Sequence, residues 1–350
     1  MPVTLNCPDG SRVVDAASNH VDEFAEVDSD AAEHAEIRTL QIGIAQHGQR
    51  LDRSLADAVT EFSRNYLQQL LAQGAVSLNG QVVSKAAQRV KVGDRICVEM
   101  RETLQSQAFR PEPMDLQIAY EDEHLLVLHK PAGLVVHPAP GNWSGTLLNG
   151  LLARDPRASL LPRAGIVHRL DKDTSGLMVV ARSRHAMDAL VRMIADRKVS
   201  RQYLALAHRP WQGSADRTVD APIGRDPRNR LRMAVVDMTV HPGKLARTDV
   251  HFLTGNDLGC LVKCTLHTGR THQIRVHMAL IGHPLVADAL YGGTLLAVMG
   301  RQALHAFRLS FVHPVTDQPL DLYAPLPLDM QQALAAWGLG YNGAQSTQGS

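Results

Sequence analysis

The chain has 350 residues, of which 45% are hydrophobic, and this is enough for two or three domains with apolar cores. It has no run of about 20 apolar residues to cross a membrane and no basic-then-apolar start typical of a secretory signal. Of its four cysteines only Cys260 and Cys264 lie close together, without a second pair for a zinc site. We therefore expect a reduced, cytoplasmic protein.

Charge is distributed unevenly along the chain. Residues 1–40 hold nine acidic and two basic side chains, a net charge of −7, so the overall charge of +1 leaves +8 for the remainder. We interpret this acidic, aromatic-poor stretch as disordered and place the whole N-terminal tail at residues 1–47. The basic remainder favours a polyanion such as RNA as partner, with ordinary surface charge as the alternative.

Residues 48–110 are predicted to form a first compact unit. Leu51 and Leu55 lie one helical turn apart, and a second apolar helix ends at Gly74. Asn79-Gly80 between short apolar segments then predicts a β-hairpin. Two helices followed by a small sheet resemble an S4 RNA-binding domain. Its expected phosphate contacts, each of which alone could be a solvated surface charge, are Arg50, Arg53, Arg64, Lys85, Arg89 and Lys91.

A proline-containing linker at residues 109–113 leads into a larger domain, which we place at residues 111–335, before a flexible tail at 336–350. Strands and helices are mixed in this domain without a repeated βαβ period. The pattern therefore favours an α+β fold over a doubly wound sheet.

The first motif of the larger domain spans Glu121–Leu152. We predict a buried strand at Leu125–Leu128, a turn at Lys130–Gly133 and another strand at Leu134–Val136. For Lys130 two interpretations are equally consistent with the sequence: an exposed lysine in a structural turn, and a catalytic residue.

The second motif, Gly165–Ser183, holds two Asp, an Arg and a Thr-Ser-Gly turn. Ile166–Val167 predicts the end of one buried strand, and Leu177–Ala181 predicts the start of the next. The polar connection His168–Gly176 is the kind of loop that presents catalytic groups. Asp171 is therefore a candidate nucleophile or base, with a turn cap or a salt bridge as the alternative.

Two later segments add further candidates. Val199–Ala207 alternates with period two, so we predict a strand with Arg201 and Tyr203 on one face. Cys264–Gly293 predicts the end of a strand, a turn, and a helix that Thr271 caps.

Together these segments resemble the RluA-type pseudouridine synthases. HRLDKDTSG, residues 168–176, is similar to their catalytic loop, and the other segments follow in family order over about residues 48–330. The resemblance is closest to the large-subunit synthase D group, which modifies uridines in helix 69 of 23S rRNA. It implies a mixed, mostly antiparallel catalytic sheet, RNA as the partner, and no metal or other cofactor. We further expect a monomer that does not associate with membranes.

The same resemblance assigns roles to single residues. Asp171 is the catalytic carboxylate, Arg275 is its basic partner, and Tyr203 stacks against the target base. Asp171 would attack C1′ of the ribose or remove the C2′ proton, and both routes need an ionised carboxylate, the usual state of Asp at neutral pH. Lys130, Pro131, His137 and Pro138 frame the cleft. Further RNA contacts are expected from Arg169, Arg201, Arg228 and Arg230.

Two positions depart from the family pattern. Arg201 stands where many relatives have Lys, which keeps the charge but changes the geometry of its donors. Ala287-Asp288-Ala289 stands where the family usually has Gly-Asp-Pro. We expect this second departure to affect the shape of the loop and not the chemistry.

Other classes of function fit parts of the sequence. A protein kinase is excluded, because Leu170 interrupts the His-Arg-Asp motif and no glycine-rich loop or Asp-Phe-Gly motif is present. A metal-dependent hydrolase could use the histidines around His272, but their spacing is not that of a helical zinc pair. A non-catalytic RNA-binding factor and a synthase for another rRNA or tRNA uridine stay open. An inactive relative would be expected to lack Asp171 or Arg275.

Overall fold

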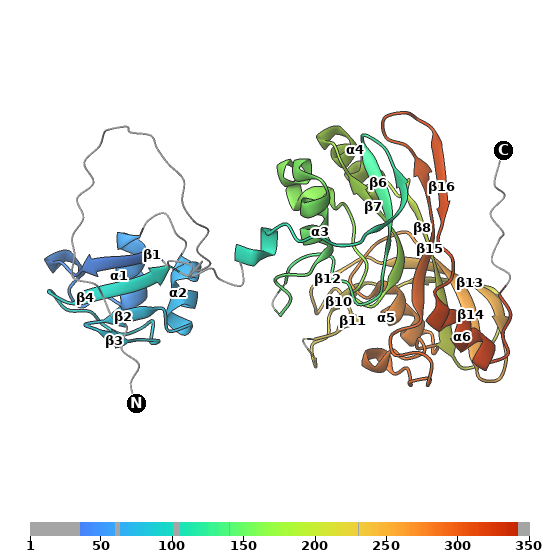
Figure 1. The fold of residues 1–350 in the computed structure, drawn as a ribbon. Coiled ribbons are helices and arrows are strands. Elements are labelled where there is room, and N and C mark those ends of the chain that lie inside the picture. The colour runs from blue at the N-terminus through green and yellow to red at the C-terminus, as the bar shows by residue number, and fades with distance from the viewer. Residues whose placement is uncertain (1–35, 60–63, 101–105, 140, 230, 342–350) are drawn as a thin grey trace. The chain divides into compact units, whose positions relative to one another are not determined.

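The structure, a computed structural model, describes residues 36–59, 64–100, 106–139, 141–229 and 231–341. The chain divides into two compact units between Gln107 and Ala108, and each is described by itself (Figure 1). The expected disorder of residues 1–35 falls outside the described residues. In the described ranges, no helix has the length and apolar character that a membrane span requires.

The smaller unit packs two helices against a four-stranded antiparallel sheet. Leu55 and Leu70 from the helices meet Val76 and Ile96 from the strands in one apolar core. Asn79-Gly80 turns the hairpin with both residues at positive φ, 52° and 82°, as the sequence predicts. The strands lie in the sheet in the order β1-β4-β2-β3. In chain order, the elements of the unit are β1 (Glu36–Gln41), α1 (Leu51–Ala58), α2 (Arg64–Ala72), β2 (Val76–Leu78), β3 (Gln81–Val82) and β4 (Arg95–Met100).

Strand β1 lies inside the segment that the composition predicts to be an acidic, disordered tail. It pairs antiparallel with β4, from Glu36 opposite Met100 to Gln41 opposite Arg95. The next residue, Ile42, is buried in the core of the unit. Residues 36–47 thus belong to the folded unit, because six residues of strand beside an acidic run are too few to change the local composition.

The larger unit is built on a nine-stranded sheet in the order β5-β6-β7-β15-β8-β14-β13-β9, with β16 beside β15. Among the strands that the structure describes, β7 and β15 alone pair in parallel. The predicted α+β fold with a mixed, mostly antiparallel sheet is therefore confirmed. The strands are β5 (Gln117–Glu121), β6 (Leu125–Lys130), β7 (Ser175–Ala181), β8 (Ser200–His208), β9 (Asp216–Asp220), β13 (Arg247–Gly255), β14 (Gly259–Leu266), β15 (Leu304–Val312) and β16 (Pro319–Tyr323).

Helices cover both faces of this sheet. Leu126 and Leu128 of β6 point into the core shared with α3 and α5, whereas Leu125 and Val127 point into the core shared with α4. Helix α6 packs further along the second face through Met330. A small sheet, β11-β10-β12, precedes β13. These elements are α3 (Leu147–Arg154), α4 (Arg184–Ala195), β10 (Ile223–Arg225), β11 (Met233–Val235), β12 (Gly243–Lys244), α5 (Gln273–Leu280) and α6 (Leu328–Ala336).

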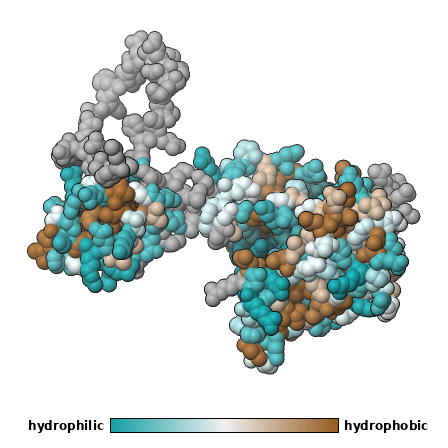
Figure 2. Space-filling model, turned by 90° about the horizontal axis from the view of Figure 1, so that it is seen from below, coloured by the Kyte–Doolittle hydropathy of each residue, from teal (hydrophilic) through white to brown (hydrophobic). Residues whose placement is uncertain are grey.

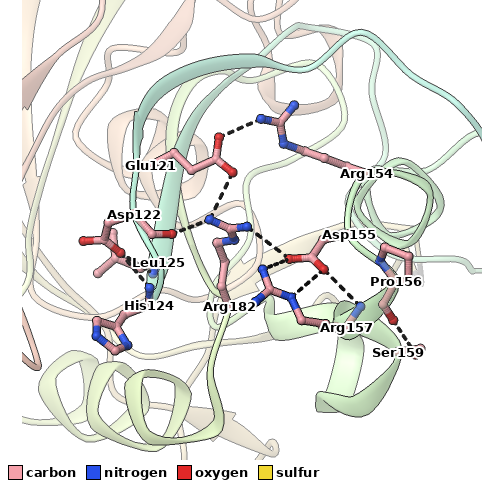
Figure 3. A network of polar contacts seen from close by, with 10 residues as sticks. All are labelled: Glu121, Asp122, His124, Leu125, Arg154, Asp155, Pro156, Arg157, Ser159 and Arg182. Atoms are coloured by element: carbon pink, nitrogen blue, oxygen red, sulfur yellow. Dashed lines mark hydrogen bonds and ion pairs between the residues drawn. The ribbon is translucent and has the colours of Figure 1, made fainter.

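A network of ion pairs fixes the C-terminal end of β7 (Figure 3). Arg182 contacts the carboxylates of Glu121 at 3.1 Å and Asp155 at 3.2 Å, and it donates a hydrogen bond to the carbonyl of Asp122. Arg154 contacts Glu121 at 2.6 Å from the end of α3. The network therefore ties α3 and β5 to the end of β7 that lies away from the candidate catalytic loop.

Two predicted strands are wrong. Leu134–Val136 is irregular, because the carbonyls of its last two residues accept hydrogen bonds from the first amides of α3. Ile166–Val167 makes a single isolated bridge, from Ile166 to Val180. In both places apolar residues are buried without a strand ladder, and apolar periodicity alone cannot distinguish these cases.

Candidate active site

A pocket of about 830 Å³ opens on the face of the large sheet that carries α3 and α5. Its walls come from three of the segments that the sequence singled out: the loop before β7, the pocket-facing side of β8, and the turn that leads into α5. Asp171, Tyr203 and Arg275, which are far apart in the chain, all line it.

The loop before β7 presents Asp171 to the pocket. The amide of Thr174 donates a hydrogen bond to the Asp171 carbonyl at 3.1 Å and closes the turn. The Nε2 of His168 accepts a hydrogen bond from the Val179 amide at 3.1 Å. Burial, with a smaller effect of the Arg201 charge, lowers the pKa of His168 to about 3, so the ring is a neutral acceptor. The side chain of Asp171 stays 17% exposed, open to a ligand in the pocket.

Arg275, on α5, contacts two carboxylates. Its Nη1 lies 3.3 Å from Oδ2 of Asp171, and its Nε and Nη2 lie 2.7 and 2.8 Å from the two oxygens of Asp288. The Tyr291 ring lies 5.0 Å from the guanidinium carbon. Burial alone would lower the pKa of Arg275, but the hydrogen bonds and charges of Asp288 and Asp171 raise it. Arg275 therefore stays cationic beside Asp171.

Asp288 is a site residue that the motifs did not reveal. Its side chain is 1% exposed, and its bidentate pair with Arg275 fixes the guanidinium plane so that Nη1 faces Asp171. The signal in the sequence was the acidic residue between Ala287 and Ala289. Ala287 has a φ of +60°, a left-handed conformation that glycine favours. Alanine thus adopts a left-handed conformation at the position where the family usually has glycine.

Tyr203 and Arg201 lie on the same, pocket-facing side of β8, as the alternation predicts. Tyr203 is buried, and burial raises its pKa to about 12, so its hydroxyl stays protonated. Arg201 is only 6% exposed, and burial lowers its pKa. Its Nε has no hydrogen-bond partner in the described part of the chain. An aromatic ring beside a buried donor suits a planar base rich in acceptors.

Further cations give the pocket a positive lining. Arg163, Arg169 and Arg197 line it and are exposed. His137 and Pro138 line it as well, as the family resemblance implies. Burial, then the charges of Arg169 and Arg163, lower the pKa of His137 to about 4. The positive lining suits a polyanion, one neutral planar group of which would enter the pocket.

Lys130 does not line this pocket. It is buried, so the alternative of an exposed turn lysine is wrong. Its Nζ donates hydrogen bonds to the carbonyls of Pro131 at 2.6 Å, Leu134 at 2.9 Å and Lys172 at 2.9 Å. Burial lowers the pKa of Lys130 to about 7. All three acceptors are backbone carbonyls, and one of them belongs to Lys172, the residue after Asp171.

The start of α5 also differs from the prediction. Its N-cap is His272, with a φ of 57°, and not Thr271. Among the described residues no side chain caps this helix. Gln273 instead holds the preceding turn, because its Oε1 accepts hydrogen bonds from the Arg270 amide at 3.0 Å and the Thr268 hydroxyl at 2.7 Å. The described residues contain no group of three His, Cys, Asp or Glu side chains placed to hold a metal ion.

The other predicted RNA-binding residues lie outside the pocket. Arg53, Lys85 and Arg89 are exposed on the smaller unit, and Arg228 is exposed in the loop after β10. On the face seen in Figure 2, hydrophilic and apolar residues are interspersed on each unit. Of the predicted residues, Arg230 lies outside the described residues, and for Arg64 the structure describes the backbone at the start of α2 but not the side chain.

Known proteins match this chain along most of its length. Residues 124–280 match the RNA pseudouridylate synthase family, and residues 49–96 match the S4 domain. "Ribosomal large subunit pseudouridine synthase D" of Neisseria meningitidis serogroup B is 45% identical over 324 residues, 88% of this chain and 84% of that protein. The Xylella fastidiosa protein of the same name is 46% identical over 302 residues, 83% and 89% of the two chains. A solved structure, human RNA Pseudouridylate Synthase Domain Containing 4, shares the fold with a TM-score of 0.50 and 23% identity over 64% of this chain and 94% of its own.

Proposed function

We propose that the substrate of this protein is large-subunit ribosomal RNA. The premise is that the chain belongs to the RluA-type RNA pseudouridine synthases. More narrowly, we propose uridines in helix 69 of 23S rRNA. The predicted enzyme class and S4 domain are confirmed by the family matches. Relatives at 41–46% identity are named for large-subunit rRNA, and this supports the substrate. The enzyme would act as a cytoplasmic monomer with RNA as its partner.

In this proposal a target uridine leaves its stack and enters the pocket. Tyr203 and Arg201 would hold the base from the β8 side. Asp171 would attack C1′ or remove the C2′ proton, and the N1–C1′ bond breaks. After the base turns, a C5–C1′ bond forms as the Asp171–C1′ bond breaks on the first route, or as C2′ regains its proton from Asp171 on the second. C5 then loses its proton, and N1 gains one. Atoms balance without a cofactor, because the product is an isomer of the substrate.

The observation that supports these roles most directly is the chain of contacts from Asp288 through Arg275 to Asp171. Asp288 holds the guanidinium in one plane, and Arg275 hydrogen-bonds the carboxylate that must be ionised on either route. Such a fixed charge geometry is what a reacting carboxylate needs.

The substrate is tested by tritium release from uridine C5. Wild-type enzyme would be mixed with a C5-labelled helix 69 stem-loop, with a stem-loop of equal length and another sequence, and with a tRNA. Release from the helix 69 stem-loop alone is expected. Release from the tRNA alone would overturn the substrate and leave the enzyme class intact. Absence of release from all three and from ribosomal particles, with RNA still bound, would favour the non-catalytic binding factor.

A further inference from the structure

The backbone that follows Asp171 is anchored by groups outside the pocket. The Lys172 carbonyl accepts hydrogen bonds from Lys130 Nζ and the Gly133 amide, both at 2.9 Å. The Asp173 carbonyl accepts one from Arg301 Nη1 at 2.9 Å. Neither Lys130 nor Arg301 lines the pocket that holds Asp171. Two consecutive carbonyls after the candidate catalytic carboxylate are thus fixed by side-chain donors that are largely shielded from solvent.

Arg301 is the more specific of these anchors. Its Nε and Nη2 bind the two oxygens of Asp329, in the first turn of α6, at 2.6 and 3.0 Å. This pairing orients the guanidinium so that Nη1 reaches the Asp173 carbonyl and Nη2 reaches the Ser175 hydroxyl at 3.2 Å. The side chain of Arg301 is 10% exposed, so solvent screens these contacts weakly.

A second cavity, of about 490 Å³, borders this anchor on the other side of the loop from the pocket. Arg301, Asp329, Ser175 and His305 are among its lining residues. Ser175 Oγ and His305 Nδ1 lie 2.9 Å apart, and burial lowers the pKa of His305 to about 4, so that ring is neutral. The donors of Arg301 are taken up by backbone carbonyls, Asp329 and the Ser175 hydroxyl, which indicates a structural task for this cluster and not a ligand site.

We propose that Arg301, oriented by Asp329, is a positioning residue for the isomerisation. It fixes the carbonyl two residues after Asp171 and through it the place of the carboxylate. The inference rests on the proposed catalytic role of Asp171. Arg275 holds the Asp171 side chain from within the pocket, while Arg301 holds the backbone from outside it. A shift of about 1 Å in a reacting group can cost about 100-fold in rate.

Arginine and lysine differ at such a position. Two nitrogens of the planar Arg301 guanidinium donate hydrogen bonds to Asp329, while Nη1 donates to the Asp173 carbonyl. A lysine would keep the charge but would lack the fixed, two-sided geometry. Arg301→Lys therefore separates the charge from the positioning effect.

The test compares Arg301→Ala, Arg301→Lys and Asp329→Asn with Arg182→Ala as matched control. Arg182 is also poorly exposed, at 17%, and it contacts two carboxylates and one backbone carbonyl, but at the other end of β7 (Figure 3). For each variant three quantities would be measured: the single-turnover rate constant at saturating RNA, the RNA dissociation constant, and the melting temperature.

The expected result is a rate constant about 10- to 100-fold lower for Arg301→Ala, with the smaller losses for Arg301→Lys and Asp329→Asn. RNA affinity stays within about threefold, since none of these side chains lines the pocket. Arg182→Ala lowers the melting temperature while its rate constant stays within about threefold of wild type. Because the second cavity borders Arg301, added guanidinium should restore part of the rate of Arg301→Ala and none of that of Arg182→Ala.

Equal rate constants for the Arg301 variants and Arg182→Ala would overturn the positioning role. If Arg301→Ala does not fold, Arg301→Lys and Asp329→Asn decide the matter, because both keep nearly the full side-chain volume. Failure of the proposed function is a separate outcome, since it would show as a wild-type enzyme without activity or as an active Asp171→Asn variant.

Discussion

The candidate active-site pocket and the S4 domain both present cationic side chains, but they hold them differently. In the catalytic unit Arg275 bridges two carboxylates and Arg301 bridges a carboxylate and a backbone carbonyl, and both are largely shielded from solvent. In the S4 domain Arg53 and Lys85 are exposed on the surface.

This difference reflects two tasks. A reacting carboxylate must be held in one place, which needs fixed partners in a region of weak screening. A phosphate backbone needs only positive charge at a suitable distance, and flexible side chains provide it. Substitutions in the pocket should therefore change the rate at saturating RNA, and substitutions in the S4 domain should change affinity and its dependence on salt.

Apart from Asp171 itself, a large effect that would sharpen this comparison is expected at Asp288. Asp288→Asn removes the charge that orients Arg275, so the guanidinium can rotate away from Asp171. We expect the single-turnover rate constant to fall about 10- to 100-fold with RNA affinity unchanged.

Asp155→Asn is the control for this substitution. Asp155 also receives hydrogen bonds from arginines, but in the network at the far end of β7 (Figure 3). The single-turnover rate constant of Asp155→Asn should stay within about threefold of that of the wild type. An Asp288→Asn variant that retains the wild-type rate would remove Asp288 from the catalytic machinery.

An intermediate effect concerns acid stability. Burial lowers the pKa of His305 from 6.5 to about 4, so the unfolded chain binds more protons than the folded one between these two values. The free energy of unfolding should therefore fall as the pH drops from about 6.5 to about 4, by up to about 1 kcal/mol per pH unit from this group.

Urea unfolding of the full chain at pH 7.5, 6.0 and 5.0 measures this loss. His305→Gln should weaken the pH dependence, because glutamine does not titrate and can still hydrogen-bond the Ser175 hydroxyl. The same pH dependence in wild type and variant would show that His305 is not among the groups that titrate on unfolding.

The smallest effect is expected in the S4 domain. The double variant Arg53→Ala/Lys85→Ala should weaken RNA binding about 3- to 10-fold and lower the slope of log affinity against log salt by about 1 to 2. Filter binding at several salt concentrations measures both quantities. A lower rate constant at saturating RNA would contradict the separation of tasks, because it would give these side chains a part in the chemistry.

Local patterns predicted much of the fold. The strands β6, β7 and β8 follow from apolar runs and alternation, and the Asn79-Gly80 hairpin follows from turn chemistry, because both signals lie within a few neighbouring residues. The motifs also named Asp171, Tyr203 and Arg275, which the structure brings into one pocket.

The supporting contacts could not be predicted in the same way. Asp288 pairs with Arg275 across 13 positions, and Arg301 reaches the Asp173 carbonyl across 128 positions. Such partners are chosen by tertiary packing, and each of these residues by itself looks like any other charged side chain. Strand β1 was missed for a related reason, since its pairing with β4 joins residues about 60 positions apart.

The most direct test of the catalytic assignment compares Asp171→Asn with Asp173→Asn. Both substitutions remove one carboxylate from the same loop, but only Asp171 lines the pocket. Single-turnover release of tritium from C5-labelled RNA would be measured at saturating enzyme. We expect a loss of more than about 1000-fold for Asp171→Asn and less than about threefold for Asp173→Asn. A wild-type rate for Asp171→Asn would contradict the catalytic assignment.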